Sequence, residues 1–157
     1  MRYIADDIGE ITILFCYIVN FDKICETHTP KELTSLLNGL FSVLDNLCEI
    51  HSVTKIETVN KTYMVAGGLK DAEQNMDSIL LKKNPAERCV AMGLDIIKRL
   101  ENVYLKTGEK LQVKIGINTG PVIAGVVGDH KPQFSLVGDT VNTASRMGTT
   151  LKAADAI

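Results

Sequence analysis

Apolar residues follow two kinds of pattern along this chain, and each kind predicts a different element. Residues 11–19 (ITILFCYIV) are almost wholly apolar and rich in β-branched side chains, which is typical of a central strand covered on both faces. Shorter runs of the same character predict strands at 53–59, 62–66, 111–117 and 122–127. Residues 1–10 are polar and mixed, so we expect a fraying lead-in there.

Two longer segments place apolar residues at helical spacing. Thr29-Pro30-Lys31-Glu32 offers a cap, a proline suited to the first helical position and a glutamate that completes a capping box. The helix predicted from it ends near His51 and has one apolar stripe. Asn84-Pro85-Ala86-Glu87 predicts a second helix, which Gly108 would stop. Its expected stripe is Val90, Gly93, Leu94, Ile97, Leu100 and Tyr104.

The remaining segments complete an order of strand, helix, hairpin, helix and strand. Asn60-Lys61 would form the hairpin turn. Residues 21–29 predict a short helix or loop, while 70–83 and 128–135 predict loops. This order is typical of the α+β class with a ferredoxin-like βαββαβ core, extended here by a further strand and a helix. A single domain over 1–157 is expected.

Composition narrows the range of partners. The chain has 157 residues, 45% of them hydrophobic, and a formal net charge of −2, which favours neither nucleic acid nor an acidic membrane surface. No apolar run approaches the ~20 residues of a membrane-spanning helix, and no basic segment followed by an apolar one opens the chain. The four cysteines lack metal-ligand spacing and each lies in an apolar segment, which predicts buried free thiols in a reducing compartment. A cytoplasmic domain is expected.

The candidate chemistry lies in residues 113–147. Asn142 and Arg146 are four positions apart in a helix opened by Gly138 and Asp139, so both project from one face. An amide beside a guanidinium, next to a glycine loop, suits a site for an anion or a sugar-phosphate.

The run from Gly138 to Met147 (GDTVNTASRM), preceded by 116–122 (GINTGPV), resembles the catalytic domain of class III nucleotide cyclases, the adenylyl and guanylyl cyclases. The resemblance implies an enzyme that converts a nucleoside triphosphate to a cyclic nucleotide and pyrophosphate. It implies that Asn142 positions the ribose and that Arg146 stabilises charge on the α-phosphate. The family domain normally continues with more strands and a lysine for the triphosphate, so a fragment of a larger protein is expected.

The resemblance also marks a departure from the family. Tyr17 and Lys61 stand where the family has its two metal-binding aspartates, and neither replaces a carboxylate toward a hard cation. We therefore predict no metal ligand in this chain and a heterodimeric enzyme. A second cyclase domain, in the same polypeptide or another one, would hold Mg²⁺ or Mn²⁺ through its own aspartates.

Two further positions bear on the base. Glu57 matches the position at which guanylyl cyclases have glutamate and adenylyl cyclases lysine, and a carboxylate accepts both hydrogen bonds that guanine N1 and N2 offer. Ser135 matches a second position, cysteine in many guanylyl cyclases, and its hydroxyl can donate to guanine O6. GTP is therefore the expected substrate, and cyclic GMP the product.

Other interpretations stay open at this point. A catalytically inactive regulatory domain would share the loss of the aspartates, and an adenylyl cyclase half would differ only at the base. Asn142 could cap its helix locally, Arg146 could form a surface ion pair, and Glu57 could be a solvated partner of Lys55 or Lys61. An RNA-binding module of ferredoxin-like fold ranks low because the strands lack surface aromatic pairs for base stacking. A membrane-anchored parent protein is left open.

Overall fold

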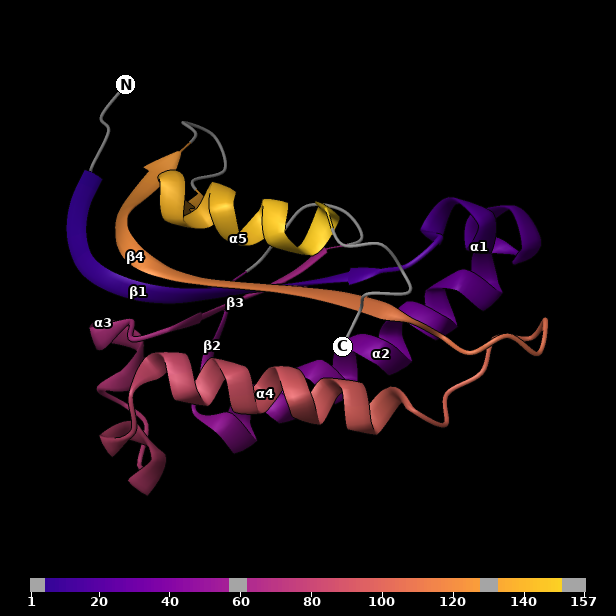
Figure 1. Cartoon of the computed structure of the whole chain (residues 1–157), viewed down its shortest axis with the longest axis horizontal. Helices are drawn as coiled ribbons and strands as arrows, with labels where there is room; N and C mark the ends of the chain where they lie inside the picture. The colour runs from indigo at the N-terminus through magenta and orange to yellow at the C-terminus, as the bar shows by residue number, and fades with distance from the viewer. Residues whose placement is uncertain (1–4, 57–61, 128–132, 151–157) are drawn as a thin grey trace.

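The computed structural model describes residues 5–56, 62–127 and 133–150. Its centre is a five-stranded antiparallel sheet in the order β2-β3-β1-β4-β5. The strands are β1 (Ala5–Ile18), β2 (Thr54–Ile56), β3 (Thr62–Gly67), β4 (Val113–Val127) and β5 (Gln133–Val137). Helices α2 (Pro30–His51) and α4 (Pro85–Leu100) cover one face, and α5 (Asp139–Thr150) covers the other (Figure 1).

The first four strands and the two crossover helices form the ferredoxin-like βαββαβ arrangement, which confirms the predicted fold class. β5 and α5 are the additions. The shorter elements are α1 (Phe21–Thr27), α3 (Lys70–Glu73) and a 3-10 turn at Ile79–Lys82. Within the described residues, no helix combines the length and apolar character that a membrane span needs.

The sheet separates two hydrophobic clusters because alternate side chains of a strand point to opposite faces. Under α2 and α4 lie Leu14 and Cys16 of β1 with Tyr63 and Val65 of β3. On the α5 side lie the intervening residues of β1, and Ala144 of α5 packs with them. The central strand is therefore buried on both faces, as its unbroken apolar run predicts.

The start signals of both long helices are confirmed. The Glu32 amide donates to Thr29 Oγ1 and the Thr29 amide donates to Glu32 Oε1, each at 3.2 Å, which completes the capping box. The Asn84 side chain accepts from the Ala86 amide at 2.8 Å. These caps satisfy amides that have no partner inside the helix.

Three strand predictions were wrong. β1 begins at Ala5, so residues 5–10 are not a lead-in but pair with β4. β4 runs unbroken through Pro121, because Pro121 lies opposite Glu10, beside a bulge in β1 that removes the regular pairing. Residues 133–137 form β5, where a loop to Ser135 was expected. The expected loop at 70–83 also contains α3 and the 3-10 turn.

The predicted stripe of α4 was also largely wrong. The helix buries Arg88, Cys89, Met92, Gly93, Ile96 and Leu100, while Val90, Leu94 and Ile97 are 48%, 61% and 39% exposed. The sequence carries two overlapping apolar stripes, and packing against the sheet selects one of them. Ile115 and Ile117 of β4 lie close against Gly93, where a small residue lets helix and sheet approach.

Candidate active site

Asn142 and Arg146 lie on the exposed side of α5. Thr140 and Ala144 on the same helix are buried, whereas Asn142 and Arg146 are exposed. At about 100° of rotation per residue, Asn142 and Arg146 share one face, and it points away from the sheet. The geometry of α5 is therefore compatible with the predicted placement of these two side chains on one face.

The first turn of α5 is fixed to β4 by polar contacts. Thr140 Oγ1 donates to the Pro121 carbonyl at 2.7 Å, and Asn118 Nδ2 donates to the Thr140 carbonyl at 3.2 Å. Gly138 precedes the helix with a φ of 138°, and its carbonyl accepts from the Asn142 amide at 3.2 Å. Gly138 thus holds the cap position, and Asp139 is the first residue of α5.

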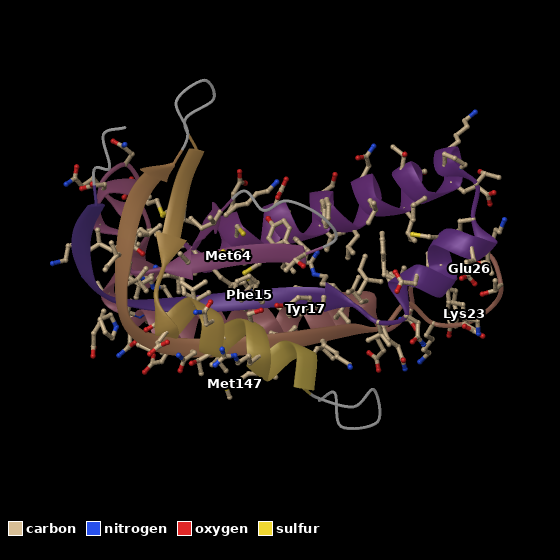
Figure 2. The ribbon with its side chains drawn as sticks, turned by 90° about the horizontal axis from the view of Figure 1, so that it is seen from above. Phe15, Tyr17, Lys23, Glu26, Met64 and Met147 are labelled. Atoms are coloured by element: carbon tan, nitrogen blue, oxygen red, sulfur yellow. The ribbon has the colours of Figure 1, made fainter. Side chains whose placement is uncertain are left out.

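Tyr17 fixes the second turn of α5 to β1. Its hydroxyl lies 2.7 Å from Ser145 Oγ and donates to the Ser145 carbonyl at 3.3 Å. The ring stacks on Phe15, with centroids 5.9 Å apart and planes 17° from parallel. Figure 2 shows Phe15 and Tyr17 side by side on the sheet, next to the helix that carries Met147. Ser145 directly precedes Arg146, so Tyr17 reaches the part of α5 that carries the candidate site.

The remaining predicted site residues are placed only in part. Ser135 is in β5, opposite Gly125 of β4, and the structure describes its backbone but not its side chain. Glu57 and Lys61 lie outside the described residues. The structure thus brings together Asn142, Arg146 and Tyr17, and the roles of Glu57, Ser135 and Lys61 stay predictions.

Sequence reasoning missed three residues that position the helix: Asn118, Thr140 and Ser145. Thr140 and Ser145 carry a local signal, because small hydroxyl residues beside the buried stripe of an amphipathic helix often bond to the neighbouring strand. Asn118 and Tyr17 carry no such signal, since their partners on α5 are distant in the chain, 128 residues away for Tyr17.

The resemblance described above implies Mg²⁺ or Mn²⁺ at the site, so the fit of this chain to a metal can be tested at Tyr17. Its phenol offers one neutral oxygen, and that oxygen is already hydrogen-bonded to Ser145. Mg²⁺ and Mn²⁺ prefer carboxylate oxygens. Residues 5–56, 62–127 and 133–150 include no group of three or more His, Cys, Asp or Glu residues able to hold a metal ion. The Tyr17 position does not fit a metal ligand.

Comparison with known proteins agrees with this architecture. A family model described as the adenylate and guanylate cyclase catalytic domain matches residues 4–155. The rat protein "Guanylate cyclase soluble subunit beta-2" is 40% identical over 144 residues, which are 91% of this chain and 20% of that protein. This chain therefore spans about a fifth of that relative's length.

Solved structures show the same fold. The guanylate cyclase domain of RhGC from Catenaria anguillulae, solved in complex with GTP, superposes with a TM-score of 0.80 at 36% identity. The match covers 94% of this chain and 76% of that one. A dimeric guanylyl cyclase domain of the RhoGC fusion protein from Blastocladiella emersonii gives 0.77 at 36% identity, covering 96% and 79%. The chain therefore belongs to the family of class III adenylate and guanylate cyclase catalytic domains.

Proposed function

We propose that this chain is one half of a guanylyl cyclase and converts GTP to cyclic GMP and pyrophosphate at a site shared with a metal-bearing partner domain. The observation that carries the proposal is the pair Asn142 and Arg146, held on the exposed face of a helix whose first two turns are fixed to the sheet. The names of the relatives support the enzyme class.

In the proposed reaction, the ribose 3′ oxygen forms a bond to the α-phosphorus and loses its proton. The bond from the α-phosphorus to the bridging oxygen breaks, and pyrophosphate leaves with the electron pair. Arg146 supplies fixed positive charge to the α-phosphate as negative charge develops there. Asn142 holds the ribose so that its 3′ oxygen faces the phosphorus.

The direction in which Asn142 and Arg146 face supports a site shared with a second domain. Asn142 and Arg146 face away from their own sheet, so a second domain is needed to enclose the nucleotide. Tyr17 does not fit a metal ligand, and Lys61 would add positive charge at the second aspartate position. The partner's aspartates would therefore hold the Mg²⁺ or Mn²⁺ ions, which neutralise phosphate charge when bound. Because GTP is cytoplasmic, the domain would face the cytoplasm, whether or not its parent protein is membrane-anchored.

GTP is the proposed substrate because Glu57 and Ser135 together match guanine. The Glu57 carboxylate would accept from the guanine N1 and N2 groups, and the Ser135 hydroxyl would donate to O6. Adenine offers no paired donors to the carboxylate.

The test is to measure cyclic nucleotide formation from GTP and from ATP, with Mn²⁺ or Mg²⁺, by this chain alone and mixed with a metal-bearing cyclase domain. Cyclic GMP should form only in the mixture. Arg146→Ala in the mixture should lower kcat about 100-fold or more, as loss of a transition-state donor does. Arg99→Ala is the matched control, because Arg99 is an exposed arginine of α4 on the other side of the sheet, and it should leave kcat unchanged. An unaffected Arg146→Ala mixture would reject the proposal.

A regulatory domain without catalysis is the second candidate, and Tyr17 favours it. The Tyr17 hydroxyl forms a hydrogen bond within the domain. An inactive domain could keep such a structural contact after losing its metal ligands. Tight association with a cyclase domain, with no product from GTP or ATP in any pairing, would support this candidate over the first.

A further inference from the structure

The hydroxyl of Tyr17 links the central strand β1 to α5, the helix that carries the proposed site. β1 is the middle strand of the sheet, and Tyr17 pairs there with Thr62 of β3 and Lys114 of β4. Its backbone is therefore fixed on both sides. The ring is held by stacking on Phe15, so the hydroxyl projects toward α5 from a rigid base.

On α5, the partner of this hydroxyl lies between the two candidate site residues. Ser145 is three residues after Asn142 and one before Arg146. The contact involves both its side-chain oxygen, at 2.7 Å, and its carbonyl, at 3.3 Å. A bond to the carbonyl restrains the helix backbone itself, not only a side chain.

The first and second turns of α5 are thus restrained by different strands. Thr140 holds the first turn to β4, and Tyr17 holds the second turn to β1. Without the Tyr17 contact, only the apolar packing of Ala144 and Val141 would resist a tilt of α5 about Thr140, and any tilt would displace Arg146 more than Asn142. The hydroxyl of Tyr17 adds a directional restraint at Ser145, directly before Arg146.

We propose that Tyr17 is a positioning residue, which holds α5 through Ser145 and so fixes Arg146 and Asn142 for the nucleotide. This inference rests on the proposed function for its catalytic consequence. In this domain, Tyr17 would therefore not bind a metal but would align Asn142 and Arg146, the groups that contact the substrate.

The first experiment measures amide hydrogen exchange of the full chain by itself. Tyr17→Phe keeps the ring and its stacking but removes the hydroxyl, and Ser145→Ala removes the side-chain partner. Both variants should speed exchange in residues 144–147 without changing exchange in α2. Tyr63→Phe is the matched control, because Tyr63 also donates from a strand, but to Asp45 on the opposite face. It should leave α5 unchanged.

The second experiment measures kcat and KM for GTP in the mixture with the metal-bearing domain. Tyr17→Phe should lower kcat about tenfold with KM within about twofold, because misplacement of Arg146 weakens mainly the transition state. The double variant with Ser145→Ala should be no worse than the more impaired single variant. Tyr63→Phe should keep the wild-type kcat. Tyr17→Asp should also have a lower kcat than wild type, because the shorter aspartate side chain cannot reach Ser145.

Either experiment can overturn the proposal. Unchanged exchange in residues 144–147 of Tyr17→Phe would show that the hydroxyl does not hold the helix. Unchanged kcat, or full additivity of the two substitutions, would show that the contact does not align the site. A wild-type mixture that makes no cyclic nucleotide would reject the proposed function instead, and the exchange result would then decide alone whether Tyr17 holds α5.

Discussion

Gly120 of β4 lies so close to Thr140 of α5 that a Cβ added to Gly120 would come within 2.5 Å of Thr140 Oγ1. That oxygen is the one that donates to the Pro121 carbonyl and fixes the first turn of α5. The absence of a side chain at Gly120 is therefore a condition for the position of the helix that carries Asn142 and Arg146.

Gly120→Ala should consequently destabilise the chain by about 1–3 kcal/mol, the usual cost of overpacking a close contact. Urea unfolding measures this change. Gly39→Ala is the control, because Gly39 is exposed in α2 with open space around it. That variant should be more stable than wild type by up to about 1 kcal/mol, since alanine favours helix. Equal stability of Gly120→Ala and wild type would contradict the close contact.

How much could be predicted from the sequence depends on how many interpretations each segment allowed. α2 has one apolar stripe and a capping box, and both were confirmed. α4 has two stripes, and only contact with β4 at Gly93 selects between them. The continuity of β4 through Pro121 could not be predicted from the local sequence. The strand tolerates the proline because of a bulge in β1, which is distant in the chain.

The same reasoning applies to the site. Asn142 and Arg146 could be paired from sequence because their relationship is local to one helix. The contact of Tyr17 with Ser145 could not, since it joins residues 128 positions apart and depends on which face of α5 meets the sheet. The resemblance implies that Tyr17 stands at a metal position of the family, and only the structure shows what the side chain contacts.

Arg88 was missed by the predicted stripe of α4, yet it is only 3% exposed. Its guanidinium donates to Glu73 Oε1 at 2.9 Å and to the Ser52 carbonyl. Arg88→Met should destabilise the chain by about 3 kcal/mol, because it leaves these acceptors in the interior without their donor.

Arg99→Met is the matched control for that measurement by urea unfolding. Arg99 is on the same helix, but it is exposed and lies 3.7 Å from Asp95. Its loss should change the free energy of unfolding by no more than about 0.5 kcal/mol. If both variants lost a similar free energy of unfolding, the buried contacts of Arg88 would stabilise the chain no more than an exposed ion pair does.

Thiol reactivity should separate Cys25 from the other three cysteines. The prediction that all four thiols are buried is wrong for Cys25, which is exposed on the short helix α1, whereas Cys16, Cys48 and Cys89 are buried. Burial raises the pKa of Cys16 and Cys89 to about 12 and that of Cys48 to about 11, so these thiols stay protonated at pH 8 and the thiolate nucleophile is scarce.

Treatment of the folded chain with N-ethylmaleimide at pH 8 should therefore add one label, at Cys25, as read by mass spectrometry of peptides. Unfolding in urea should allow all four to react. Cys25→Ser should leave the folded chain unlabelled. Rapid native labelling of Cys16 or Cys89 would show that the sheet opens far more readily than its packing indicates.

Base preference tests the part of the proposal that depends on Glu57 and Ser135. Glu57→Lys combined with Ser135→Asp exchanges a carboxylate acceptor for a donor and a hydroxyl for an acceptor. For GTP the change removes hydrogen bonds to guanine. It places the lysine donor against the N1 and N2 donors and the aspartate acceptor against the O6 acceptor. Since hydrogen bonds to charged groups contribute about 1.5–3 kcal/mol each, kcat/KM for GTP should fall about 100-fold. ATP, with its acceptor at N1 and donor at N6, should become the better substrate.

The measurement is kcat/KM for both nucleotides in the mixture with the metal-bearing domain. Glu49→Lys is the control for the charge change, because Glu49 is exposed on α2, on the sheet face opposite α5. It should leave the preference for GTP intact. If the double variant lost activity with both nucleotides equally, Glu57 and Ser135 would be needed for folding or assembly rather than base choice. Retained GTP preference would instead place base recognition in the partner domain, because only groups that contact the base can discriminate between guanine and adenine.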